Sequence, residues 1–152
     1  MLRTFIVFLL LSQIVQSQVR VSTLGAEFKS HDQINAQITN AAKGTVSYCV
    51  EFGQHSFKAA SSTIEDMETT PIPFYVQRQN GRKWATLLIG PDIGSSKHVV
   101  VLKPGQSQRY PFRLSDRGRM RLVLDYLDGE NEKACEYPKG KKTTRSNAFV
   151  VN

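Results

Sequence analysis

The 152-residue sequence has few of the residues that build metal and redox sites, with three histidines, two cysteines and three methionines. His31, His55 and His98 are far apart along the chain. They form no H-x-H or H-E-x-x-H pattern, and the two cysteines form no C-x-x-C pair. Because a metal site needs several ligands at characteristic spacings, the sequence predicts no metal site and no cofactor.

Signatures of catalysis are also missing. The chain contains no G-x-S-x-G motif and no glycine-rich loop that precedes a helix, which argues against a serine hydrolase elbow and a nucleotide site. The nearest reactive cluster is Asp92, Ser95, Ser96 and His98, within one short stretch. The same residue types satisfy backbone amides in turns, so a turn is the favoured interpretation. We therefore expect the chain not to be an enzyme, and a secreted hydrolase is only a third hypothesis.

Long hydrophobic runs are absent apart from one near the N-terminus. Residues 5–11 are unbroken and apolar, yet this run is shorter than the roughly 20 residues that span a bilayer. Arg3 precedes the run, and Val15-Gln16-Ser17 offers short side chains where a signal peptidase cleaves. We predict a signal peptide over residues 1–17, a mature chain that starts at Gln18, and a secreted or periplasmic location. A buried N-terminal strand is the alternative.

What the chain does have is an excess of basic residues. The formal net charge is +7, and losing Arg3 with the signal peptide leaves +6. The sequence pI is about 9.6. A basic exported protein can meet anionic polymers, but a solvated basic surface is the simpler interpretation. Residues 18–152, which number 135 (152 − 17), suffice for one domain with a sizeable core.

Polar and apolar residues alternate with a period of two along most of the mature chain, which predicts an all-β fold. The predicted strands are residues 19–23, 33–39, 45–52, 74–79, 83–89, 98–102, 108–114, 119–126 and 148–151. Asn80-Gly81, Pro104-Gly105 and Asp128-Gly129 predict turns between them. Residues 53–71, 90–96 and the basic segment 138–145 are predicted loops, and no pattern indicates a helix of three turns.

Five short segments carry a likeness to a known kind of domain. They are Ile38-Thr39-Asn40, Leu102-Lys103-Pro104-Gly105-Gln106-Ser107, Tyr110-Pro111-Phe112, Gly118-Arg119-Met120-Arg121-Leu122 and Phe149-Val150-Val151. With these segments the chain resembles exported immunoglobulin-like sandwich domains of bacteria over most of residues 19–151. The resemblance implies a two-sheet sandwich of about eight strands, and an adhesive, structural or accessory module rather than an enzyme. A fold alone is a weak guide to function.

The two cysteines are expected to form a disulfide. Cysteines in an exported chain usually pair, and a Cys49–Cys135 bond closes a loop of about 85 residues. Two buried thiols, or one reactive thiol, are the alternative. Cys49 alternates with Tyr48 and Val50, so it points outward if those two side chains face the core. We therefore predict that the bond lies outside the inter-sheet core and that Trp84 packs separately from it.

Arginines on outward-facing strand positions are the most suggestive polar feature. Arg109, Arg113, Arg119 and Arg121 all fall on such positions. In immunoglobulin-like topologies the strands around residues 109 and 121 can fall in different sheets, in which case the four side chains do not form one patch. Strand arginines also cover their neighbours and discourage edge pairing. Anion binding is thus a hypothesis, and nucleic acid is not expected because few exposed aromatic residues are interleaved with the charges.

The favoured function is that of an exported non-catalytic domain that acts by surface contacts with protein or polysaccharide, with an anionic polymer as a further option. The candidate residues lie in the 90–96 loop, on the hairpin after Pro73 and in the late basic segments: Tyr75, Arg78, Asp92, Ser95, Ser96, Arg119, Arg121, Lys139, Lys141, Lys142 and Arg145. The alternative is a protease-inhibitor-like module that presents residues 61–73 as a rigid loop.

Overall fold

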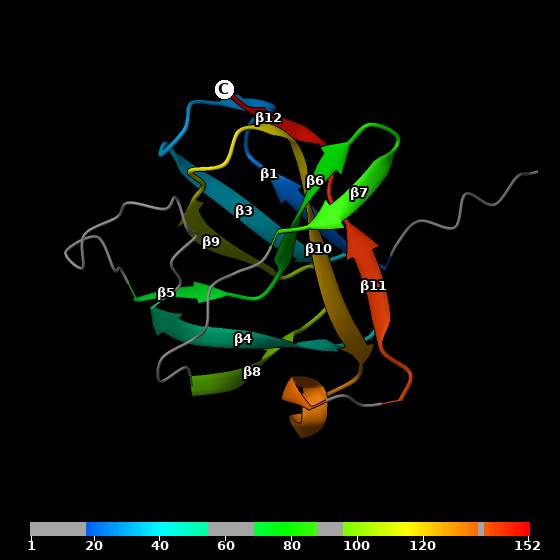
Figure 1. The fold of residues 1–152 in the computed structure, drawn as a ribbon. Helices are drawn as coiled ribbons and strands as arrows, with labels where there is room; N and C mark the ends of the chain where they lie inside the picture. Colours follow the sequence, from blue (N-terminus) through cyan, green and yellow to red (C-terminus); the bar gives the residue numbers. More distant parts are fainter. Residues whose placement is uncertain (1–17, 55–68, 88–95, 137–138) are drawn as a thin grey trace, which may run out of the picture.

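The computed structural model describes residues 18–54, 69–87, 96–136 and 139–152, which form twelve strands and one short 3-10 helix (Figure 1). The strands are β1 Val19–Thr23, β2 Glu27–Phe28, β3 Gln33–Asn40, β4 Val46–Gln54, β5 Thr69–Ile72, β6 Tyr75–Asn80, β7 Lys83–Thr86, β8 Ser96–Leu102, β9 Ser107–Arg113, β10 Gly118–Asp128, β11 Lys142–Arg145 and β12 Phe149–Val151. The helix, η2, spans Glu132–Cys135. The all-β prediction is confirmed for this part of the chain. Within it, no helix has the length and hydropathy to cross a membrane.

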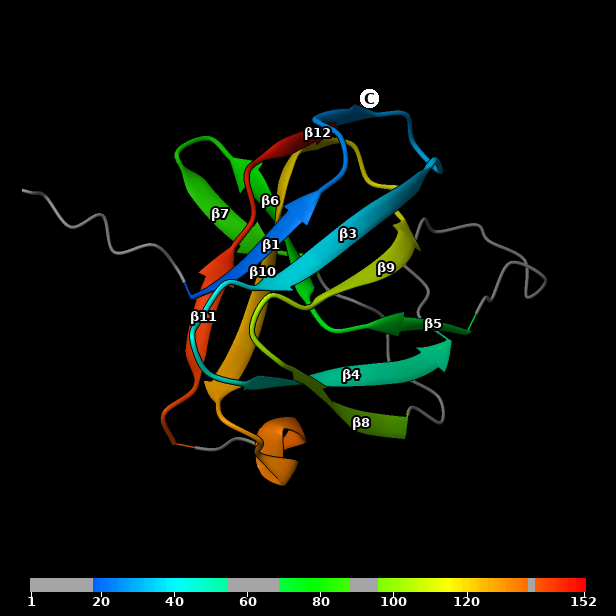
Figure 2. The same ribbon diagram turned by 180° about the vertical axis from the view of Figure 1, so that it is seen from behind.

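The strands form two sheets that face each other. The smaller sheet has the order β1-β3-β9, and the larger one follows β2-β12-β10-β4-β5 with β6, β7, β8 and β11 attached. Figure 2 shows the three-stranded sheet in front of the larger one. β10 is the longest strand and joins the parts of the larger sheet, because it pairs with β12, β6 and β11 and ends against β4. Beyond that point β4, β5 and β8 run crosswise to it (Figures 1 and 2).

The core fills the space between the two sheets and follows the predicted alternation. Every second residue of β3 from Ile34 to Ile38 is buried in the core cluster, and so is every second residue of β10 from Met120 to Tyr126. Two aromatic contacts reach the smaller sheet from the other side of the core. The ring of Phe74, just before β6, has its centroid 5.1 Å from that of Phe112, and the Tyr48 and Tyr110 hydroxyls share a hydrogen bond of 2.8 Å. Burial raises the pKa of both tyrosines.

The disulfide between Cys49 and Cys135 is present, as the sequence predicted. Both cysteines are half-buried and neither belongs to the core cluster, which confirms a bond on the outside of the sheet. The bond joins β4 to η2, a helix with no buried residue that contacts β4 and β8. It therefore fastens a surface element to the sheet. Trp84 stacks elsewhere, against Arg121.

Some predicted boundaries are wrong. The described residues form twelve strands, more than the eight or so that were expected, and the predicted loop 138–145 contains strand β11. β11 buries only Thr144, so its sequence has no alternation of apolar residues from which a strand could be predicted. β5 begins in the predicted loop 53–71 and contains Pro71. A proline is tolerated in this strand because β5 is an edge strand, paired with β4 alone among the described strands. The two-residue strand β2 is too short to give a pattern.

Candidate functional site

The outer surface of β7, β6, β10 and β11 gathers basic and aromatic side chains. The even-numbered residues of β10 face the core, so Arg119 and Arg121 face outward. The strand register places Gln77 beside Arg121, and Trp84 beside Gln79 one strand further on. Arg145 of β11 lies opposite Val123. We call this surface the arginine face and define it by six residues: Tyr75, Gln77, Trp84, Arg119, Arg121 and Arg145.

Two of these arginines are held by neighbouring side chains. The Arg121 Nε donates a hydrogen bond of 2.9 Å to Gln77 Oε1, and its guanidinium carbon lies 4.2 Å from the centre of the Trp84 ring. Arg119 donates a bond of 3.3 Å to Gln79 Oε1. Burial, together with the neighbouring charge of Arg145, lowers the pKa of Arg121. The guanidinium still carries its charge at neutral pH, so the surface presents oriented cations.

Tyr75, Val123 and Arg145 form one row across three strands. Val123 pairs with Tyr75 on one side and with Arg145 on the other. It is completely buried although it belongs to the outward-facing set of β10. Long side chains can cover an apolar neighbour in this way. Burial and the nearby carboxylate of Asp125 raise the pKa of Tyr75, an effect that the surrounding cations oppose. The row therefore places a phenol and a guanidinium on either side of a buried valine.

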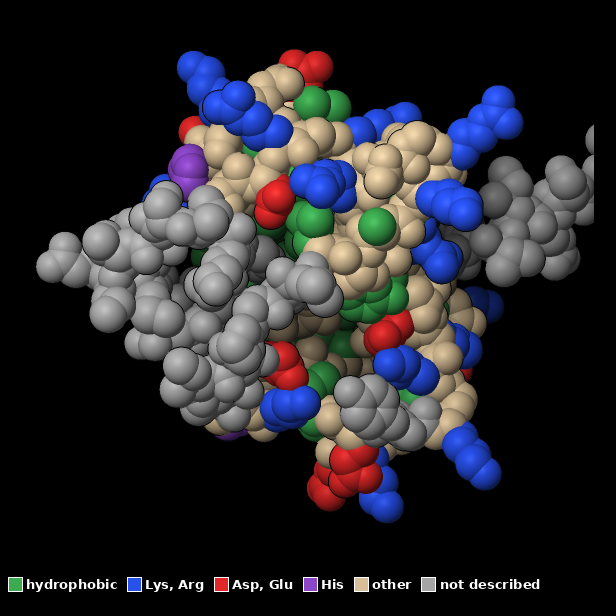
Figure 3. All heavy atoms as spheres, in the orientation of Figure 1, with side chains coloured by type: hydrophobic (Ala, Val, Ile, Leu, Met, Phe, Trp, Pro, Cys, Tyr) green, Lys and Arg blue, Asp and Glu red, His purple; other side chains and the backbone are tan. Residues whose placement is uncertain are grey.

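None of the three arginines of the face has an ion-pair partner among the residues that the structure describes, and Asp125, the next outward residue of β10, is paired with Lys141. The ion pairs found there are Arg78–Asp116, Lys97–Glu51, Lys141–Asp125 and Lys142–Asp128. Each uses an acidic side chain with a different cation, so Arg119, Arg121 and Arg145 stay unneutralised within this set. In Figure 3 basic side chains gather on the side of the molecule that carries β7 and β11.

A groove of about 270 Å³ lies next to the face and shares Tyr75 with it. The disulfide lines the groove together with Phe74 and η2 residues. Two ion pairs of 2.8 Å each, Glu51–Lys97 and Asp125–Lys141, also line it. Figure 3 shows the hollow with acidic and basic side chains at its rim. Glu136 adds one further carboxylate to the lining. The groove therefore has no excess of positive charge, in contrast to the adjoining face.

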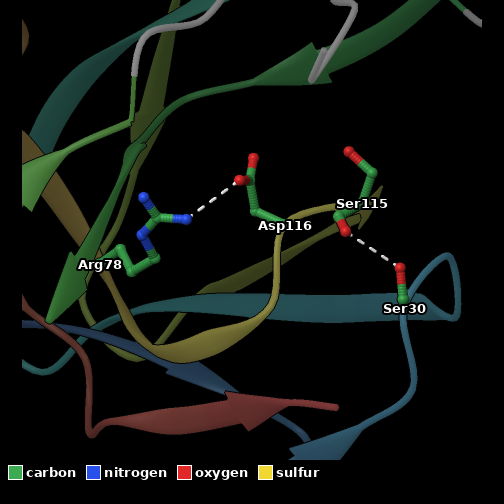
Figure 4. Close-up of polar contacts among 4 residues, drawn as sticks. All are labelled: Ser30, Arg78, Ser115 and Asp116. Carbon is green, nitrogen blue, oxygen red and sulfur yellow. Dashed lines mark hydrogen bonds and ion pairs between the residues drawn. The ribbon is translucent and has the colours of Figure 1, made fainter. Parts of the chain in front are cut away.

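The structure brings some of the predicted site residues together and separates others. Tyr75, Arg119, Arg121 and Arg145 share the arginine face. Arg78 lies on the opposite side of β6 and forms an ion pair of 3.2 Å with Asp116, near the bond from the Ser30 hydroxyl to the Ser115 carbonyl (Figure 4).

The remaining predicted residues have other partners, lie elsewhere on the chain or fall outside the described part. Lys141 and Lys142 are engaged in ion pairs, Lys139 is exposed, and Ser96 begins β8. Asp92 and Ser95, like most of the 61–73 loop, are not among the described residues. Arg109 and Arg113 belong to β9, so the structure places them in a different sheet from Arg119 and Arg121.

Sequence reasoning overlooked Gln77 and treated Trp84 as a packing residue only. Both occupy alternating positions in the predicted hairpin around Asn80-Gly81, so their outward direction was readable. What joins them to Arg121 is the pairing of β6 with β10, two strands that lie about 40 residues apart in the chain. The described residues contain no group of three or more side chains arranged to hold a metal ion.

Comparison with known proteins adds little to this geometry. No protein-family model and no curated protein matches the chain. A solved structure of the ASH/PapD-like domain 7 of human CEP192 shows 12% identity and a TM-score of 0.38, covering 99% of this chain and 96% of that one. The sporulation control protein Spo0M of Bacillus subtilis shows 11% identity and a TM-score of 0.41, covering 89% of this chain and 49% of that one. Neither likeness bears on function.

Proposed function

We propose that this chain is an exported, non-catalytic immunoglobulin-like domain that binds protein or polysaccharide through the arginine face. Its signal peptide is residues 1–17 and its domain residues 18–152. The observation that carries the proposal is the set of three arginines without a carboxylate partner among the described residues, two of them held in place by Gln77, Gln79 and Trp84. Cations oriented in advance lose less conformational entropy on binding than mobile ones.

The disulfide supports the exported location. Such bonds persist in oxidising compartments and are rare where thiols are kept reduced. It also suits a binding role, because it fastens one wall of the groove that adjoins the face. The domain thus combines a stapled sheet with a rigid, charged outer surface.

The test is retention of material from the exported and cell-surface fraction on the immobilised mature chain. The variant Arg121→Ala/Arg145→Ala removes two face cations, and Arg109→Ala/Arg113→Ala removes two outward cations from the other sheet. We expect the first variant to lose the retained protein or polysaccharide and the second to keep it. Equal retention by the wild type and both variants would show that the face is not the binding surface.

A further inference from the structure

The spacing of the three arginines suits a repeating anion. Arg119 and Arg121 are two residues apart on one strand, which sets their backbones about 7 Å apart. Arg145 is the diagonal neighbour of Arg121 on β11, at about 7–8 Å. A small anion reaches one or two such groups, whereas a chain with a charge on each repeating unit reaches all three. The spacing of the three arginines therefore favours a polymer over a small ligand.

Most N–H donors of Arg121 and Arg145 remain available to a ligand. A guanidinium has five N–H donors. Among the described residues the Arg121 guanidinium uses one of them, toward Gln77, and the Arg145 guanidinium uses none. Sulfate and carboxylate groups accept two parallel bonds from such a fork. Hence the two arginines have the donors that an acidic group needs without first breaking an ion pair.

The side chains around the three arginines suit a ligand rich in hydroxyl groups better than one whose bases stack on aromatic rings. The Gln77 amide and the Thr86 hydroxyl lie side by side, 3.4 Å apart, and offer exchangeable partners to sugar hydroxyls. Tyr75 adds a half-buried ring with a polar tip. Arg121 already covers one side of the Trp84 ring, which leaves a poor platform for a nucleic acid base.

We infer that the ligand of the arginine face is an acidic polysaccharide, a sugar chain that carries sulfate or carboxylate groups. This inference rests on the proposed function and names its ligand class. The polymer lies along Arg119, Arg121 and Arg145, with its acidic groups on the guanidinium forks and its hydroxyls on the amide and hydroxyl side chains between β6 and β7.

The first experiment uses Trp84, the only tryptophan of the chain, as a reporter. The protein is titrated with dextran, carboxymethyl dextran and dextran sulfate, which share one sugar backbone and differ in charge. We expect the Trp84 emission to change with both charged polymers and not with dextran. The apparent affinity for dextran sulfate should fall about tenfold between roughly 50 and 150 mM salt. Equal responses to charged and neutral dextran would overturn the inference.

The second experiment locates the site by retention on immobilised dextran sulfate. Arg121→Ala/Arg145→Ala should weaken binding by about tenfold or more, and Arg109→Ala/Arg113→Ala by less than about twofold, with melting curves confirming that both fold. If the first variant does not fold, Arg145→Glu provides the same test at an exposed position without a hydrogen-bonded partner among the described residues. Equal weakening in both double variants would show non-specific attraction and overturn the inference.

Competing polymers separate this inference from the proposed function. Tighter binding of polyglutamate or single-stranded DNA than of dextran sulfate would overturn the polysaccharide assignment. If no charged dextran binds while retention of exported material still depends on Arg121 and Arg145, the ligand class is wrong and the proposed function stands. If that retention does not depend on the face, the proposed function fails as well.

Discussion

Two outward-facing surfaces of this molecule carry three arginines each, yet they differ in the spacing of the arginines and in the side chains beside them. One is the arginine face. The other, which we call the β9 face, is the outer surface of β1, β3 and β9 and carries Arg20, Arg109 and Arg113. On the β9 face Arg109 donates a bond of 3.4 Å to Gln37, much as Arg121 does to Gln77. Charge and amide partners are therefore common to both surfaces.

Spacing and neighbours distinguish the two surfaces. Arg109 and Arg113 are four residues apart, about 13 Å along the strand, with Pro111 between them. None of the outward residues of β1, β3 and β9 is aromatic, and short polar pairs such as Thr39–Ser107 (2.8 Å) fill the space. The arginine face instead sets its cations on adjacent positions beside Tyr75 and Trp84. The number of charges alone does not make a binding surface, because their separation and their neighbours decide what they can hold.

The largest effect on stability is expected from removing the disulfide, which fastens η2 to β4 beside the groove. Replacing both cysteines, Cys49→Ser/Cys135→Ser, should lower the free energy of unfolding by about 4–5 kcal/mol, because the bond closes a loop of 86 residues in the unfolded chain. The measurement is chemical denaturation of the variant and the wild type under oxidising conditions.

The variant should keep its β-sheet circular dichroism spectrum, since the core contains neither cysteine. Amide hydrogen exchange should accelerate in η2 and at its contacts with β4, and change little in β3 and β9. A variant without a folded population at room temperature would contradict a core that packs independently of the bond.

A smaller effect on stability is expected in the core between the two sheets, where Tyr48 meets Tyr110. Tyr48→Phe should cost about 1–2 kcal/mol, because it leaves the buried Tyr110 hydroxyl without its partner. Tyr48→Phe/Tyr110→Phe should recover part of that loss, since no hydroxyl is then left unpaired. Urea denaturation of the three proteins measures both differences. A double variant that loses the sum of the two single losses would contradict a coupled pair.

The same tyrosines predict a pH dependence. Burial raises the pKa of both above the unfolded value of about 10, so their neutral forms stabilise the fold below that pH. The stability is lost as the pH rises above about 10, because the unfolded chain then releases protons that the folded one retains. Melting temperatures between about pH 8 and 11 should fall more steeply for the wild type than for the double phenylalanine variant.

The smallest effect is expected at Ser47 in β4. Its hydroxyl is fully buried and has no hydrogen-bond partner among the described residues, so Ser47→Ala should be neutral or stabilising by up to about 1 kcal/mol. Ser47 pairs with Leu127 in the larger sheet. Among the described residues of β1, β3 and β9 no buried side-chain oxygen or nitrogen lacks a hydrogen-bond partner. A loss of more than about 1 kcal/mol in the denaturation midpoint analysis would reveal a partner for this hydroxyl.

Local patterns in the sequence predicted much of this architecture. Alternation located most strands and their inward sides, Asn80-Gly81 located the β6–β7 hairpin, and the position of Cys49 in its strand placed the disulfide outside the core. Each of these features depends on residues within a few positions of one another or, for the bond, on there being only two cysteines.

The candidate site was harder to predict because it depends on long-range pairing. Arg121 meets Gln77 and Arg145 only through the registers of β10 with β6 and β11, and no local pattern encodes a register between distant strands. β11 itself was missed since its one buried residue is a threonine. Four arginines were correctly expected to face outward, but which of them belong together required the sheet order.

Arginine footprinting tests the contrast between the two surfaces within one molecule. The protein is treated with an arginine-selective dicarbonyl reagent, with and without saturating dextran sulfate, and the modified residues are quantified by mass spectrometry. The account predicts that the polymer protects Arg119, Arg121 and Arg145 and leaves modification of Arg20, Arg109 and Arg113 unchanged. Equal protection on both surfaces, or stronger protection of the β9 face, would contradict it.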